Sequence, residues 1–392
     1  MTGAILSPAN EAELVGIIRD LAHAKAPLRI SGGGTRMKFG RPVQAATSLS
    51  TRNLTGITLY EPAEMVIGAR AGTPIAEIEA ALSEKGQMLA FEPPDWRMLL
   101  ASSGEPTIGA VAAGNLSGSR RLWGGAARDS LIGVTFVNGA GEIIRSGGRV
   151  MKNVTGLDIV KLQAGAWGTL GVLSEVIFKV VPQPEASATL MLEGLDDHAA
   201  IQAMIAAVTS PFEITGAAHD PEAGKTWLRI EGLSFSVDYR ADALAQRLAP
   251  FGALRRIDPQ ESAKLWPRIR DAAPLAEPRD QVLWRLSLKP SEAAKAIEAI
   301  RAERAARVLY DWGGSLVWLA TPIPENAGAA TIRRAAKAAG GHATLTRAPE
   351  AMRMQIPVFE PEAAPLAALG KRIKGAIDPA GLFNPSLMHP GA

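Results

Sequence analysis

Three consecutive glycines, Gly32 to Gly34, follow a short apolar stretch and constrain the fold of this 392-residue chain more than any other feature. In PLRISGGGTRMKFG, Leu28 to Ile30 predict a strand that ends at the glycines. Residues without a Cβ let successive backbone N–H groups converge on one anion, typically a phosphate oxygen, and Thr35 adds a hydroxyl donor. A tight corner that needs positive φ explains the same residues, so both interpretations stay open on this segment alone.

Two familiar nucleotide-binding motifs do not fit this segment. A P-loop requires Gly-Lys-Ser/Thr after its glycines, and Thr35-Arg36-Met37-Lys38 does not supply it. The Rossmann fingerprint requires G-x-G-x-x-G running into a helix. The glycines here are followed by RMKFGRP, which is not a helix start.

The chain contains no cysteine, which excludes disulfides, cysteine-ligated zinc and iron–sulfur clusters within it. If electrons leave this chain through an iron–sulfur centre, a partner must hold that centre. The formal charge of +3 is too small to indicate nucleic-acid binding. Neither a long apolar run nor a signal peptide is evident, so we expect a cytoplasmic protein that reaches the inner face of the membrane only through partners.

Hydrophobic periodicity predicts one α+β domain over residues 1–182. Its first helix is capped by Asn10, with Glu13 as the capping-box partner. A strand, a glycine turn and a helix follow over residues 65–85, and Asn-Gly-Ala-Gly at 138–141 predicts a hairpin turn.

Beyond a linker, residues 187–346 repeat one order of elements twice: strand, helix, strand, strand, helix, strand. This order is the ferredoxin-like βαββαβ signature, so we expect a cap domain of two such units. Residues 347–392 predict one helix near 362–377 and a tail interrupted by prolines.

Two further segments are rich in small residues. The first covers residues 104–129, GEPTIGAVAAGNLSGSRRLWGGAARD. Its small residues would let the backbone approach a flat ligand, to which its hydroxyl and amide groups could donate. A small-residue helix packed in a core explains the same composition. In residues 152–176, Gly165, Gly168 and Gly171 recur every three positions before a strand, which a plain loop also explains.

Together these segments resemble the FAD-binding domain of the vanillyl-alcohol oxidase (PCMH-type) flavoprotein superfamily. There the glycine loop holds the FAD pyrophosphate, and the counterpart of PTIGAVAAGNLSG lies along the ribityl chain and the isoalloxazine. GAWGTLGVLSEV resembles the segment that closes the domain, and IDPAGLFNPSLM resembles a C-terminal return to it. The resemblance implies an α+β, two-part FAD-binding domain followed by the cap. It also implies non-covalent FAD, because no histidine or cysteine occupies the glycine loop.

Within that superfamily, NLSGSRRLWGGAARD and the Trp266-Pro-Arg-Ile-Arg segment resemble the E-subunit family of bacterial glycolate oxidase (glycolate dehydrogenase). Such subunits work beside a catalytic flavoprotein subunit and an iron–sulfur subunit that takes the electrons. The resemblance implies an FAD-binding subunit of a complex that oxidises glycolate, a 2-hydroxy acid, to glyoxylate. Two alternatives stay open: a non-catalytic structural subunit, and a stand-alone FAD-dependent hydroxy-acid oxidoreductase.

The resemblance also assigns cofactor contacts by position. The pyrophosphate loop corresponds to Gly32, Gly33, Gly34 and Thr35, with Gly40 ending its second turn. The remaining assigned contacts, which lie near the flavin, are Thr107, Ile108, Gly109, Asn115, Gly118, Val172 and Asn384. A simple Asn-Pro turn explains Asn384 equally well.

Neither a catalytic residue nor a metal site can be assigned from the sequence. The D-2-hydroxy acid dehydrogenases of the superfamily carry a His-x-Gly-Asp-Gly-Asn motif, which this chain lacks. A carboxylate substrate needs an arginine clamp and a nearby base. No base stands out, and the sequence cannot rank the clamp candidates Arg120, Arg268, Arg285 and Arg353.

Overall fold

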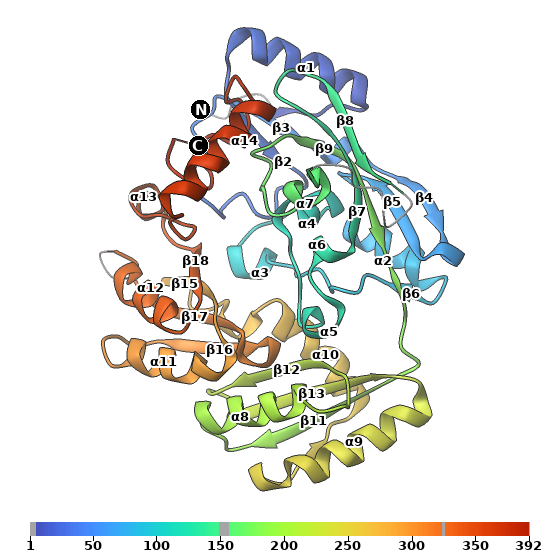
Figure 1. Ribbon diagram of the computed structural model, residues 1–392, viewed down its shortest axis with the longest axis vertical. Helices are drawn as coiled ribbons and strands as arrows, with labels where there is room; N and C mark the ends of the chain where they lie inside the picture. The colour runs from blue at the N-terminus through green and yellow to red at the C-terminus, as the bar shows by residue number, and fades with distance from the viewer. Residues whose placement is uncertain (1–4, 149–156, 324–325, 392) are drawn as a thin grey trace.

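A computed structural model of the protein describes residues 5–148, 157–323 and 326–391. Residues 152–156 of the third glycine-containing segment therefore lie outside the described residues. Figure 1 shows two layers of the molecule, one containing both ends of the chain and one built on a single wide sheet.

The part with both chain ends holds a five-stranded antiparallel sheet in the order β4-β5-β9-β7-β8. A parallel sheet, β1-β3-β2, and the pair β6–β10 lie beside it. The bounds of these strands are β1 Ile5–Leu6, β2 Leu28–Ser31, β3 Thr47–Ser50, β4 Ile57–Glu61, β5 Val66–Arg70, β6 Gln87–Met88, β7 Leu131–Val137, β8 Ile143–Gly147, β9 Val172–Lys179 and β10 Val181–Pro182.

Helix α1 begins as its sequence predicts, because the Asn10 side chain accepts a hydrogen bond from the backbone N–H of Glu13. The predicted hairpin is also present, formed by β7 and β8 on either side of residues 138–142. The helices of this part are α1 Glu11–Ala24, α2 Ile75–Ser83, α3 Arg97–Leu100, α4 Ile108–Gly114, α5 Arg121–Gly124, α6 Ala127–Ser130, α7 Ile159–Gln163, α13 Glu350–Gln355 and α14 Ala364–Ile377.

The cap contains the two predicted βαββαβ units, fused into one eight-stranded sheet in the order β14-β11-β13-β12-β16-β17-β15-β18. The units join through β12 and β16, at His219 and Tyr310. The first unit comprises β11 Ala186–Glu193, α8 Asp197–Val208, β12 Ile214–Asp220, β13 Lys225–Gly232, α9 Ser234–Leu248 and β14 Arg255–Arg256. The second comprises β15 Gln281–Ser287, α11 Ala293–Arg301, β16 Arg307–Asp311, β17 Leu316–Pro322, α12 Ala329–Ala338 and β18 His342–Arg347. The helix between them, α10 Pro259–Arg270, was not predicted.

The cap sheet has two different faces because side chains alternate along a strand. Trp284 and Leu286 of β15 pack in the core shared with the cap helices, which cover the outer face in Figure 1. Leu283 of the same strand belongs to the core of the other part of the molecule. Arg285 therefore points to the inner face, where the two parts meet.

The C-terminal return lies beside the first strand of the glycine segment. Phe383 forms an isolated parallel bridge with Leu28, and the Leu28 N–H donates to the carbonyl of Leu382 at 2.8 Å. Residues from early and late in the described chain thus build one corner of the molecule.

Candidate functional site

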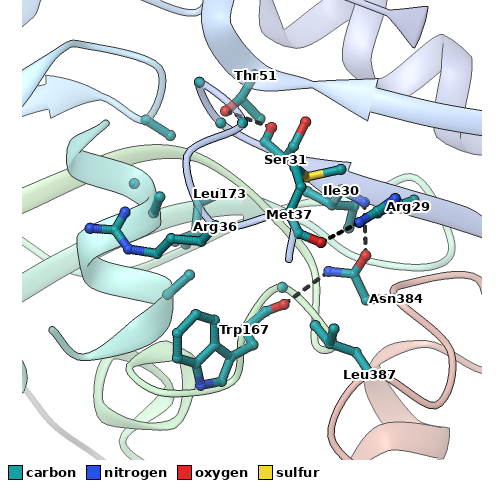
Figure 2. Close-up of a pocket in the computed structure, with 18 of the residues that line it drawn as sticks. Arg29, Ile30, Ser31, Arg36, Met37, Thr51, Trp167, Leu173, Asn384 and Leu387 are labelled. Atoms are coloured by element: carbon teal, nitrogen blue, oxygen red, sulfur yellow. Dashed lines mark hydrogen bonds between the residues drawn. The ribbon is translucent and has the colours of Figure 1, made fainter. Parts of the chain in front are cut away.

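A pocket opens where β2 ends, and residues from several segments line it, four of which contribute most of the lining residues (Figure 2). These are the glycine segment, helix α4, the loop before β9 and the C-terminal return. The lining includes Arg29, Gly32, Gly33, Gly34, Thr35, Arg36, Gly109, Trp167, Gly168, Gly171, Asn384 and Leu387.

The three glycines meet different requirements. A Cβ at Gly32 would overlap the Thr107 side chain, and one at Gly33 would overlap the carbonyl oxygen of Glu105. Both glycines therefore allow the segment before α4 to lie against the loop. Gly34 has φ +84° and no atom within 4 Å of its Cβ position, so it turns the backbone and leaves open space.

The backbone N–H groups of Gly32, Gly33, Gly34 and Thr35 donate no hydrogen bond to any residue that the structure describes. Thr35 is only 4% exposed, and the three glycines are half-buried. Since nearly all buried backbone donors in proteins have a partner, four consecutive donors without one indicate a ligand-binding position.

Two arginines add positive charge to this pocket. Arg29 donates to the carbonyl of Met37 at 2.6 Å, and Arg36 donates to that of Pro94 at 3.0 Å. Burial lowers the pKa of Arg36 to about 10, with Asp95 and Asp271 acting in the opposite direction. The guanidinium stays charged at neutral pH, and the pocket has no acidic residue in its described lining. Neither arginine was predicted from the sequence, although Arg36 lies only two residues after Gly34.

Asn384 ties three of the lining segments together, as the dashed lines in Figure 2 show. Its side-chain oxygen accepts from the Ile30 N–H at 2.8 Å, and its amide donates to the Trp167 carbonyl at 2.9 Å. It has φ +43° and is 3% exposed. Its side-chain amide is thus occupied by the protein itself, which makes Asn384 a clamp at the edge of the pocket.

The other residues predicted near the pocket occupy four kinds of position. Gly109 lines it, and a Cβ there would lie 2.6 Å from that of Ala71. Thr107, which is 2% exposed, has a hydroxyl without a hydrogen-bond partner among the described residues and lies against Gly32. Ile108 and Val172 place their side chains in hydrophobic cores. Gly40, with φ +78°, packs against Leu387 of the C-terminal return.

Asn115 and Gly118 lie farther along, toward the cap. The Asn115 side chain accepts from the Arg128 N–H at 2.9 Å, and its residue lines a second cavity. Gly118 accepts from the Trp312 indole N–H at 2.9 Å, so it joins the two parts of the molecule. The sequence segment thus runs from the first pocket to the second cavity.

The second cavity, of about 280 Å³, lies between α4, α5 and the inner face of the cap sheet. Phe39 and Trp167 line both this cavity and the first pocket, and their rings stack with centroids 4.3 Å apart. The polar lining residues of the cavity are Asn115, Ser117, Arg121, Arg270, Arg285, Ser287, His342, Thr344 and Thr346.

The structure separates the four arginines proposed as clamps. Arg120 forms a buried ion pair with Glu231 at 2.6 Å, and Arg353 donates to the Gly40 carbonyl at 2.6 Å. Arg268 is exposed on α10. Only Arg285 faces the second cavity, together with Arg121 and His342, which the sequence did not single out for it.

Within the described ranges, no cluster of three or more His, Asp or Glu side chains could hold a metal ion. No helix in those same ranges combines the length and apolarity needed to span a membrane.

Comparison with known proteins is consistent with this geometry. The family described as "FAD binding domain" matches residues 2–147. Glycolate oxidase subunit GlcE of Escherichia coli (strain K12) is 36% identical over 365 residues, which cover 93% of each chain. Glycolate oxidase subunit GlcD of Bacillus subtilis (strain 168) is 32% identical over 192 residues, 49% of this chain and 39% of that protein.

Two solved structures share the fold at low sequence identity. A 4-ethylphenol oxidase from Gulosibacter chungangensis superimposes with a TM-score of 0.72 and 13% identity, covering 98% of this chain and 89% of its own. An alkyldihydroxyacetonephosphate synthase superimposes with a TM-score of 0.69 and 15% identity, and the match covers 97% of this chain and 75% of that protein. These matches confirm the predicted PCMH-type α+β fold.

Proposed function

The chain belongs to the family of the glycolate oxidase subunit GlcE, and we propose that it is the FAD-carrying subunit of a complex that oxidises glycolate to glyoxylate. The observation that carries this proposal is the row of four unpaired N–H groups at residues 32–35. Assembly with other subunits requires no such row, whereas a diphosphate needs donors of this kind.

The residues present fit FAD. The amides of Gly32 to Thr35 would hold the diphosphate, and the guanidinium of Arg36 would balance its charge. Gly34 leaves room for the ligand, and Gly109 brings the start of α4 close to the same space. The segment from Thr107 and Ile108 to Asn115 and Gly118 would follow the cofactor toward the cap, and the backbone of Val172 would contact it. Gly40 and Asn384 hold the C-terminal return at the edge of the pocket.

When bound, FAD supplies the two-electron acceptor for oxidation of an alcohol carbon. The chain's contribution is to bind and orient the cofactor and to enclose the second cavity beside it. Neither histidine nor cysteine occurs in the glycine loop, so we propose non-covalent attachment.

The proposed partners are a second, catalytic flavoprotein subunit and an iron–sulfur subunit. This chain has no cysteine, so an iron–sulfur acceptor must come from another polypeptide. We propose a cytoplasmic complex that meets the inner face of the membrane through those partners. We propose domain boundaries at 1–182, 187–346 and 347–392.

An absorption spectrum of the purified chain, with glycolate- and D-lactate-dependent dye reduction, tests the proposal. We expect a flavin spectrum, release of FAD on denaturation, and turnover only after the partner subunits are added. A colourless chain would instead indicate a scaffold. Turnover by the chain alone would indicate a stand-alone oxidoreductase.

A further inference from the structure

The second cavity is built from the inner face of the cap sheet. On β15 and β18, Arg285 is paired with Thr344, and Ser287 with His342, so all four side chains project to this face. Trp318 of β17 stands beside Arg285 on the same face. Because the strands are fixed by their register, these groups form a rigid wall.

Arg285 has no ion-pair or hydrogen-bond partner for its side chain among the described residues. Its guanidinium carbon lies 5.1 Å from the ring centroid of Trp312 and 5.9 Å from that of Trp318. Burial lowers its pKa to about 10, and Arg121 lowers it further. The guanidinium therefore stays charged at neutral pH in surroundings that do not neutralise it.

Arg121 approaches the same indole from α5, with its guanidinium carbon 4.5 Å from the Trp312 centroid. Its side chain likewise has no hydrogen-bond or ion-pair partner in the described part of the chain. By contrast, Arg270, which also lines the cavity, is neutralised by Asp271 at 2.8 Å. The indole face attracts each guanidinium, but the two like charges disfavour each other, and an anion bound between them would relieve that repulsion.

Two buried donors complete the cavity. The indole nitrogen of Trp96 and the hydroxyl of Thr346 have no hydrogen-bond partner among the described residues, and their side chains are 4% and 0% exposed. The lining contains no carboxylate. Asp311 lies outside this lining and raises the pKa of Arg285 by its charge. Its carboxylate accepts hydrogen bonds from the Ser119 hydroxyl and from the backbone N–H of Trp312, at 2.7 Å each.

We propose that Arg121 and Arg285 bind the carboxylate of the hydroxy acid in this cavity, so that the subunit keeps a substrate site although it lacks the histidine motif. This inference rests on the proposed function, which assigns FAD to the first pocket and a hydroxy acid as the substrate. The second cavity adjoins that pocket, since Phe39 and Trp167 line both. The two guanidiniums act as positioning groups, and Trp96 and Thr346 offer further donors to the same anion.

The test is calorimetric titration of the purified full-length chain with glycolate and with glycolamide, its neutral counterpart. We expect glycolate to bind and glycolamide not to bind. Arg285→Gln and Arg121→Gln should each weaken glycolate at least about tenfold, since each removes a charge-assisted hydrogen bond. Arg268→Gln, an exposed arginine on the neighbouring helix, should leave the affinity unchanged.

Flavin absorbance and thermal melting are measured on every variant. Folded Arg285→Gln and Arg121→Gln proteins that bind glycolate like the parent would overturn the inference, as would equal binding of glycolamide. If a glutamine variant does not fold, Arg285→Lys serves instead, and unchanged glycolate affinity in that folded variant counts against a planar guanidinium clamp. A parent chain that contains no flavin would contradict the proposed function. The glycolate titration would still show whether Arg121 and Arg285 bind the carboxylate, so the two failures can be told apart.

Discussion

At the scale of single residues, adjacent glycines in one loop have different physical reasons. Gly33 is required by the carbonyl of Glu105, so its replacement disturbs the protein itself. Gly34 is required only by its φ of +84°, and its side-chain position faces open space. A substitution at Gly34 can therefore separate ligand binding from folding.

Gly34→Ala is predicted to weaken FAD binding about tenfold or more, because a methyl group would enter the ligand's space. The positive φ should cost roughly 1–2 kcal/mol of stability. Gly224→Ala is the matched control, since Gly224 has φ +60° and no neighbour within 4 Å. Equilibrium titration with FAD measures the affinity of the two variants, and thermal melting measures their stability. Equal FAD affinity in the two variants would contradict the role of the loop.

The glycine loop could be predicted because its signal is local: a strand, three small residues and a hydroxyl. The cluster of Arg121 and Arg285 around Trp312 could not be predicted, because both arginines reach this ring only after the cap packs onto α5. No spacing in the sequence distinguishes Arg285 from Arg353, and only burial and partners do so. The FAD prediction is confirmed by the family match, while the individual contacts stay predictions.

At the scale of elements, the pocket depends on one clamp. Asn384 connects β2, the loop before β9 and the C-terminal return through two side-chain hydrogen bonds and a backbone bond to Leu28. The βαββαβ order of the cap was predictable from periodicity alone. The fusion of the two units into one sheet was not predictable. It depends on the pairing of edge strands β12 and β16, and no pattern in the sequence indicates which edge strands pair.

Asn384→Ala is expected to lower stability by about 2 kcal/mol, because it leaves the Ile30 N–H and the Trp167 carbonyl without partners. FAD should also be lost more readily on dilution. Asn53→Ala, which removes one exposed hydrogen bond to Ser7, serves as control and should cost much less. Chemical denaturation of both variants measures the difference. Similar costs at the two sites would show that Asn384 is an ordinary turn residue.

At the scale of the whole molecule, a chain of ion pairs connects the two parts. The two terminal guanidinium nitrogens of Arg229, Nη1 and Nη2, each donate to Glu92 at 2.9 Å, and Arg120 pairs with Glu231 at 2.6 Å. Although burial alone would raise it, the pKa of Glu92 is lowered by Arg229 and Arg120, so the carboxylate is charged at neutral pH. This network fixes the cap over the second cavity.

Glu92→Ala is expected to destabilise the protein by about 3 kcal/mol, because the buried Arg229 would lose its two-nitrogen pair with Glu92 and keep the longer contact of its Nε with the Glu231 carboxylate at 3.3 Å. Glu222→Ala breaks the exposed pair with Arg307 and should cost less than about 1 kcal/mol. Thermal unfolding of the two variants compares them. A Glu92→Ala protein as stable as Glu222→Ala would show that the network does not hold the cap in place.

The most direct test of the central claim is a crystal structure of the chain with FAD. We predict that the diphosphate lies within hydrogen-bond distance of the N–H groups of Gly32, Gly33, Gly34 and Thr35. A diphosphate bound elsewhere, with those four amides still unpaired, would contradict it.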